Sequence, residues 1–248
     1  MRSFRCSART LLLSALLLAM PALAGSLAAP WTTISQVRMG TTMGIVTTLQ
    51  MKQRLEKRGT NGGTPQAALA AAPVQAGDLV VASNPAVTAQ ARQAFIGGLS
   101  RNSGKAVADE ADRLFGNVQT TFARMVAPYG LRSDDFADVM TAYMIVMWMS
   151  VNQQTELPQR SQVQAVRSQM RNSFVSAAGK VSDARQRQLM AEAVMYQTCM
   201  AVAIREQAQA QSKPELLSSL ASAINQNMST GGISLASMAL TDQGLVRR

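Results

Sequence analysis

The sequence groups six of its acidic residues into two tight clusters. The first cluster is Asp109, Glu110 and Asp112, and the second is Asp134, Asp135 and Asp138. Paired carboxylates are the groups that a hydrolase uses as general acid and general base. Both clusters, however, fall where a helix is expected to begin, and acids are common there because they favour the positive end of the helix dipole. We therefore interpret both clusters as structural.

Histidine is absent from the sequence, and its absence excludes several kinds of enzyme. Neither a Ser-His-Asp nor a Cys-His arrangement can be assembled. Zinc sites of the usual kind need histidine or paired cysteines, and Cys199 stands alone once Cys6 is removed with the N-terminal segment. We expect Cys199 to be buried, with an intermolecular disulfide as the alternative, and we expect no internal disulfide. No cofactor or metal is predicted.

Lysine and arginine outnumber the acids by 24 to 14. Arg160, Arg167 and Arg171 share one face of a helix because they are seven and four residues apart, and Lys180 follows. This basic stripe (Arg160, Arg167, Arg171 and Lys180) is a candidate surface for an acidic protein or an anionic envelope component. The alternative is an ordinary solvated helix face. Nucleic acid is not expected, because aromatic residues do not interleave with the basic ones.

The most apolar stretch after the N-terminus is VMTAYMIVMWMSVNQ, residues 139–153. It is too short to cross a membrane, which takes about 20 residues. Its methionines share a helical face and are soft ligands of the kind that select copper, so a periplasmic copper-binding protein is one alternative. Because methionine also fills gaps in cores, we interpret the stretch as the buried central helix of a bundle. The side chains predicted to be buried are Met140, Tyr143, Met144, Met147 and Trp148.

A second apolar helix, LMAEAVMYQTCMAVAI at residues 189–204, contains a single acid, Glu192. If Glu192 is buried, its carboxylate needs a partner such as an arginine or a tyrosine hydroxyl. We favour the interpretation in which it lies on an exposed edge near Arg185 or Gln188. Together with Asp134 and Asp135, it supplies the candidate acids of the second alternative, an envelope hydrolase.

These residues must be positioned by helices, because aromatic residues make up only 4% of a chain rich in alanine, methionine and glutamine. Apolar spacing predicts helices over residues 87–101, 105–127, 134–154, 159–177, 183–210 and 214–228. Ser133 is the predicted N-cap of the third helix. No strand is predicted in the C-terminal tail, residues 234–248. The predicted fold is all-α, a compact bundle of about five to six helices.

The N-terminus has the order of a secretory signal peptide over residues 1–24. A segment with three arginines precedes the apolar residues 10–20, and Ala22-Leu23-Ala24 forms a small-residue cleavage site. Cleavage after Ala24 lowers the formal net charge from +10 to +7 and predicts a periplasmic or extracellular protein. Residues 25–58 are expected to hold a short helix at most, residues 59–84 to form a low-complexity linker, and residues 85–248 to form the helical domain.

Several segments resemble a family of bacterial exported proteins that is catalogued only as a domain of unknown function. They are Asn84-Pro85, APYGLRSDDFAD (127–138), AYMIVMWMSVN (142–152), VQAVRSQMR (163–171), LMAEAVMYQ (189–197) and LTDQG (240–244). The resemblance covers roughly residues 80–246. It implies an α-helical exported domain and supplies no activity.

The sequence therefore predicts a non-enzymatic, exported helical module that binds a protein or an envelope component. The two alternatives are the envelope hydrolase that uses carboxylates and the copper-binding protein that uses methionines.

Overall fold

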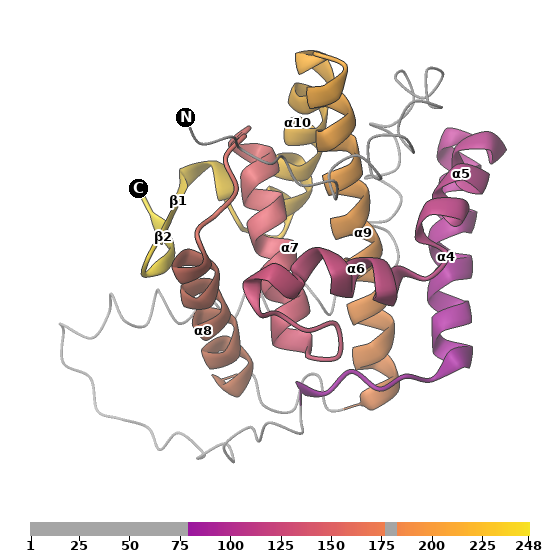
Figure 1. The fold of residues 1–248 in the computed structure, drawn as a ribbon, viewed down its shortest axis with the longest axis horizontal. Coiled ribbons are helices and arrows are strands. Elements are labelled where there is room, and N and C mark those ends of the chain that lie inside the picture. Colours follow the sequence, from indigo (N-terminus) through magenta and orange to yellow (C-terminus); the bar gives the residue numbers. More distant parts are fainter. Residues whose placement is uncertain (1–78, 177–182) are drawn as a thin grey trace, which may run out of the picture.

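The structure, a computed structural model, describes residues 79–176 and 183–248 (Figure 1). These residues form seven α-helices, two short 3-10 turns and one two-stranded antiparallel sheet. The elements are α4 (Pro85–Ser103), α5 (Lys105–Phe115), α6 (Val118–Val126), η2 (Ala127–Tyr129), α7 (Phe136–Val151), α8 (Arg160–Ser176), α9 (Ala184–Ala210), α10 (Pro214–Thr230), η3 (Leu235–Ser237), β1 (Met238–Thr241) and β2 (Gly244–Arg247). The predicted helical fold is confirmed. The expected signal peptide, the segment 25–58, most of the expected linker and Lys180 lie outside the described residues.

Helix α7 is the centre of the bundle, with α6, α8, α9 and α10 around it (Figure 1). Fourteen of its sixteen residues are buried, including all five side chains predicted to be so. Burying one large apolar side chain contributes about 1.5–3 kcal/mol, so this helix supplies much of the stability of the fold. No helix in the described part of the chain is both long and apolar enough to span a membrane.

Helix α9 is the second core helix, and it joins the two halves of the bundle. Asp183 caps its first turn by accepting hydrogen bonds from the backbone N–H groups of Arg185 and Gln186, at 2.8 and 3.1 Å. Helices α4 and α6 pack against α9, and so do α7 and α10, which also pack against each other. The rings of Phe95 on α4 and Tyr196 on α9 stack with their centroids 4.4 Å apart.

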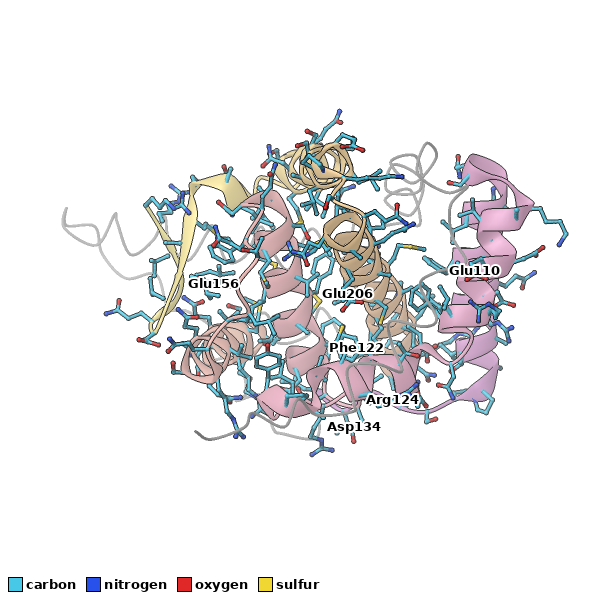
Figure 2. All side chains as sticks on the ribbon, turned by 45° about the horizontal axis from the view of Figure 1, so that its top comes forward. Glu110, Phe122, Arg124, Asp134, Glu156 and Glu206 are labelled. Atoms are coloured by element: carbon cyan, nitrogen blue, oxygen red, sulfur yellow. The ribbon has the colours of Figure 1, made fainter. Side chains whose placement is uncertain are left out.

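The helix predicted over residues 105–127 is two helices. The chain turns at Gly116, where a Cβ atom would lie 2.7 Å from the carbonyl oxygen of Asp112. Asn117 then starts α6, because its side chain accepts a hydrogen bond from the backbone N–H of Thr120 at 3.1 Å. On α6, Phe122 is fully buried while Arg124 is exposed (Figure 2).

The C-terminal tail forms a β-hairpin that was not predicted. Its two-residue turn ends at Gly244, whose φ of 98° suits glycine. The side chain of Gln169 on α8 bonds both backbone groups of Leu245, at 2.9 and 3.3 Å, while Trp148 Nε1 donates to the carbonyl of Met238 at 2.9 Å. The hairpin therefore depends on distant helices and not on a strand-like sequence pattern.

Residues 79–84 belong to the helical domain, although the linker was predicted to extend to residue 84. Leu79 and Val81 are buried, and the N–H of Val81 donates to the carbonyl of Asp134 at 2.9 Å. Arg187 Nε on α9 donates to the carbonyl of Val80 at 2.8 Å. These two apolar side chains and the backbone bonds offset the entropy of ordering the segment.

Candidate functional site

The second acidic cluster surrounds the start of α7, where the chain must satisfy its first backbone N–H groups. Asp135, and not Ser133 as predicted, is the N-cap. Its side chain accepts from the N–H groups of Ala137 at 3.0 Å and Asp138 at 3.2 Å. The cap forms two residues later than expected, at Asp135, whose backbone is still extended.

Asp138 is completely buried, and both of its oxygens are bonded. Arg167 on α8 makes a bidentate ion pair with it through Nε and Nη2, at 2.6 and 2.8 Å. The backbone N–H of Arg132 donates to the same carboxylate at 3.0 Å. A planar guanidinium that meets a carboxylate with two parallel bonds is the strongest form of this pair. Asp138 is therefore a compensated structural charge.

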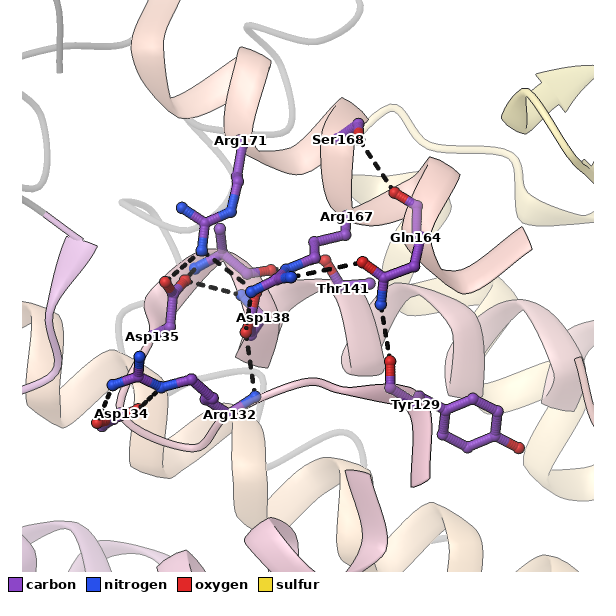
Figure 3. Close-up of polar contacts among 11 residues, drawn as sticks. Tyr129, Arg132, Asp134, Asp135, Asp138, Thr141, Gln164, Arg167, Ser168 and Arg171 are labelled. Carbon is purple, nitrogen blue, oxygen red and sulfur yellow. Dashed lines mark hydrogen bonds and ion pairs between the residues drawn. The ribbon is translucent and has the colours of Figure 1, made fainter. Parts of the chain in front are cut away.

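A second arginine of α8 extends this network (Figure 3). Arg171 pairs with Asp135 and lies 3.5 Å from Asp138. One turn before Arg167, Gln164 accepts from Arg167 at 3.4 Å and donates to the carbonyl of Tyr129 at 2.7 Å. The polar side of α8 thus fastens α8 to the start of α7 and to η2.

The structure separates the members of the basic stripe. Arg167 and Arg171 are ion-paired to α7, whereas Arg160 is exposed and forms no ion pair with the described residues. Arg160 lies against Gly130, where an added Cβ would come within 3.0 Å of its Nη2. Lys180 lies outside the described residues. Binding of a partner by this stripe stays a prediction, with Arg160 as its freest described member.

The remaining clustered acids are ion-paired at the surface. The pairs are Arg92–Asp112, Lys105–Asp109, Arg113–Glu110 and Arg132–Asp134. Hydrogen bonds from the paired arginines lower the pKa values of Glu110, Asp112 and Asp134. A general acid needs the opposite shift, a raised pKa. The first cluster also lies beyond the first turn of α5, which begins at Lys105, so ion pairing and not helix capping accounts for these acids.

Glu192 is fully buried, and the prediction that it lies on an exposed edge is wrong. Its Oε1 accepts three hydrogen bonds: from Thr88 Oγ1 on α4 at 2.8 Å, from Gln119 Nε2 on α6 at 2.9 Å, and from Gln188 Nε2 on α9 at 2.8 Å. Its Oε2 has no hydrogen-bond partner among the described residues, and neither has the buried hydroxyl of Tyr196. The donors are all neutral, and neither an arginine nor a tyrosine hydroxyl, the two partners expected for a buried Glu192, bonds it among the described residues.

Gln188 organises this second polar region. Its side chain accepts from the N–H of Asn84 at 2.9 Å and donates to the carbonyl of Asn84 at 3.0 Å, which fixes the start of α4 on α9. The sequence did carry a signal for the region, because Gln188, Glu192 and Tyr196 recur every four residues. That spacing places them on one face of a helix that is otherwise largely apolar.

The sulfur-containing residues belong to the core. Met140, Met144 and Met147 are buried among apolar neighbours, and Met228 accepts a hydrogen bond from the Tyr143 hydroxyl at 3.7 Å. Cys199 is buried as predicted, and burial raises the pKa of its thiol to about 12. A thiol with so high a pKa is a poor nucleophile at neutral pH.

The fold and these two polar regions define an all-α protein whose buried carboxylates are held by side chains from other helices. The chain belongs to a family of unknown function (DUF6683), whose sequence pattern matches residues 6–248. The family assignment agrees with the resemblance found in the sequence and extends it over the N-terminal residues. Neither the curated proteins nor the solved structures contain a match to the chain.

Proposed function

We propose that the mature chain is an exported, non-enzymatic helical module that binds an acidic protein or an anionic envelope component. The observation that carries the proposal is the state of the clustered carboxylates. Asp135 and Asp138 are tied to the arginines of α8, and arginine neighbours lower the pKa values of Glu110, Asp112 and Asp134. This arrangement favours a structural use of the acids over acid–base catalysis.

The charge of the chain supports an anionic partner. The formal net charge is +10, and it is +7 once the expected signal peptide is removed. Exposed arginines such as Arg160 and Arg124 form no ion pair with the described residues, so their charge is available to a partner. Attraction of this kind raises the rate of encounter with an acidic surface and weakens as salt is added.

The test is to crosslink the mature protein within its native envelope, purify it with whatever is attached, and identify the captured species. Arg160→Glu removes the exposed member of the stripe that lies at the start of α8. Arg124→Glu is the matched control, because it makes the same charge change at an exposed arginine of α6. We expect one captured species to be retained by the wild type and by Arg124→Glu and to be lost with Arg160→Glu.

If both variants lose the captured species equally, binding depends on the overall positive charge and not on the stripe. A purified sample that cleaves an envelope polymer, and whose cleavage is abolished by Glu192→Gln, would overturn the proposal in favour of a hydrolase.

A further inference from the structure

Arg92 lies one helical turn after Thr88, the residue of α4 that bonds the buried carboxylate of Glu192. Thr88 and Arg92 lie one turn apart on α4, and Glu192 and Tyr196 lie one turn apart on α9. Asn84 bonds Gln188 at 2.9 Å and, four residues further along both segments, Thr88 bonds Glu192 at 2.8 Å, so the two segments run parallel and in register. Arg92 consequently lies level with Tyr196.

The electrostatics agree with this placement. The pKa of Arg92 is raised chiefly by its hydrogen bond to Asp112 and by the charge of Asp112, and also by Tyr196. Burial raises the pKa of Tyr196 to about 12, and Glu192 adds to this increase while Arg92 opposes it. The Tyr196 hydroxyl therefore lies within electrostatic reach of both the guanidinium and the buried carboxylate.

The present partner of Arg92 is Asp112 on α5, bound through two hydrogen bonds of 2.6 and 2.7 Å. The side chains of this pair are 47% and 33% exposed, so water competes with the contact and the pair contributes little to stability. It is the single ion pair between α4 and α5 in the described part of the chain.

We propose that Glu192 Oε2 and the Tyr196 hydroxyl form a second acceptor site for a guanidinium group, and that Arg92 exchanges between Asp112 and this site. One cation then serves two carboxylates, of which one is solvated and the other is buried. When Arg92 leaves, Asp112 is hydrated at the surface. When Arg92 arrives, the two buried oxygens that lack partners gain a charged donor.

The exchange would loosen α5. Its apolar side chains, Val107, Ala111 and Phe115, stay on α4 by packing, but the ion pair that joins the two helices is released. The α4–α5 hairpin therefore has a tighter state and a looser state, and the position of Arg92 determines which is present.

A double-mutant cycle on the mature protein tests the exchange by thermal unfolding. Asp112→Asn and Glu192→Gln are near-isosteric changes that leave the fold intact. After Asp112→Asn, Arg92 moves to Glu192, and after Glu192→Gln it stays on Asp112, so each single change has a small effect. The double variant leaves Arg92 with neither carboxylate, and we expect its Tm to fall about 2 °C further than the sum of the single changes, because the excess cannot exceed the small contribution of the surface pair.

The matched control pairs Glu192→Gln with Asp109→Asn, which removes an exposed carboxylate of α5 that bonds Lys105. The Tm changes of these two variants should add to within about 1 °C. The excess loss in the Asp112 cycle should also vanish when the cycle is repeated with Arg92→Gln. An additive Asp112 cycle, or an excess that persists with Arg92→Gln, overturns the proposal.

Discussion

In residues 79–176 and 183–248, Asp138 and Glu192 are the two completely buried carboxylates, and their surroundings differ. Asp138 receives a bidentate ion pair from Arg167, a backbone N–H from Arg132 and a longer contact from Arg171. Glu192 receives three neutral donors on one oxygen, and no described residue donates to the other. Both carboxylates lie on core helices, so burial alone does not distinguish them.

The difference shows what each carboxylate does for the fold. Removing Arg167 leaves the buried carboxylate of Asp138 without its bidentate partner, and removing Asp138 leaves Arg167 without a carboxylate. Neutralising Glu192 leaves no cation unpaired, since its three donors carry no charge. The first region is a structural joint between α7 and α8. The second buries a carboxylate oxygen that has no partner among the described residues, which makes it the better candidate for function.

The largest effect is expected for Arg167→Ala. The change removes the bidentate partner of a fully buried carboxylate, and we expect a loss of about 3–5 kcal/mol in the free energy of unfolding. Urea denaturation measures it. Arg160→Ala, an exposed arginine on the same helix, is the control and should change the free energy by less than about 0.5 kcal/mol. Equal losses would mean that Asp138 does not depend on Arg167.

A smaller loss is expected for Asp135→Ala. The change removes both the N-cap of α7 and the partner of Arg171, and a lost cap costs about 0.5–2 kcal/mol. Ser133→Ala, at the residue predicted from the sequence to be the cap, should be nearly neutral. If Ser133→Ala were the more costly change, the assignment of the cap to Asp135 would be wrong.

In the second region, Gln119→Ala tests whether the neutral donors hold Glu192. Its side chain supplies one of three hydrogen bonds to Oε1, and the loss of one such bond costs about 0.5–1.5 kcal/mol. The loss should be smaller when Glu192→Gln is already present, because an amide oxygen is a weaker acceptor than a carboxylate oxygen. A full loss in that background would show that Gln119 acts through packing.

The smallest effect concerns the exposed acids. Because arginine neighbours lower the pKa values of Asp112, Glu110 and Asp134, the stability they contribute is present above their ordinary pKa values of 3.8 to 4.5. It is lost as the pH falls through and below that range, where these carboxylates take up protons. Unfolding followed between pH 6 and pH 2 should show this loss, and Asp134→Asn should reduce it slightly. If the loss of stability at low pH were unchanged after all three acids are neutralised, these ion pairs would not be its cause.

The sequence predicted the helices well because their apolar residues recur at helical spacing. The stretch 139–153 was correctly interpreted as the buried α7, and the helix predicted over residues 183–210 is α9, which begins at Ala184 after its cap Asp183. The division at Gly116 was missed because the apolar spacing continues across it. The hairpin was missed because its strands are four residues long and are held by Gln169 and Trp148, which are distant in the sequence.

The candidate site was harder to predict from the sequence than the helices were. The spacing of Arg167 and Arg171 showed that they share a helix face, but not that this face meets the acids of α7. The burial of Glu192 depends on Thr88 and Gln119, which come from helices more than 70 residues earlier in the chain. Local pattern predicts which residues share a surface of a helix, and only the packing decides what that surface contacts.

The most direct test compares Asp138→Asn with Glu192→Gln in the same urea denaturation experiment. Both changes replace a fully buried carboxylate by its amide, so size and burial are matched. We predict that Asp138→Asn lowers the free energy of unfolding by at least about 2 kcal/mol more than Glu192→Gln, which should be within about 1 kcal/mol of the wild type. Equal losses in the two variants, or a larger loss for Glu192→Gln, would contradict the distinction between a compensated and an uncompensated buried charge.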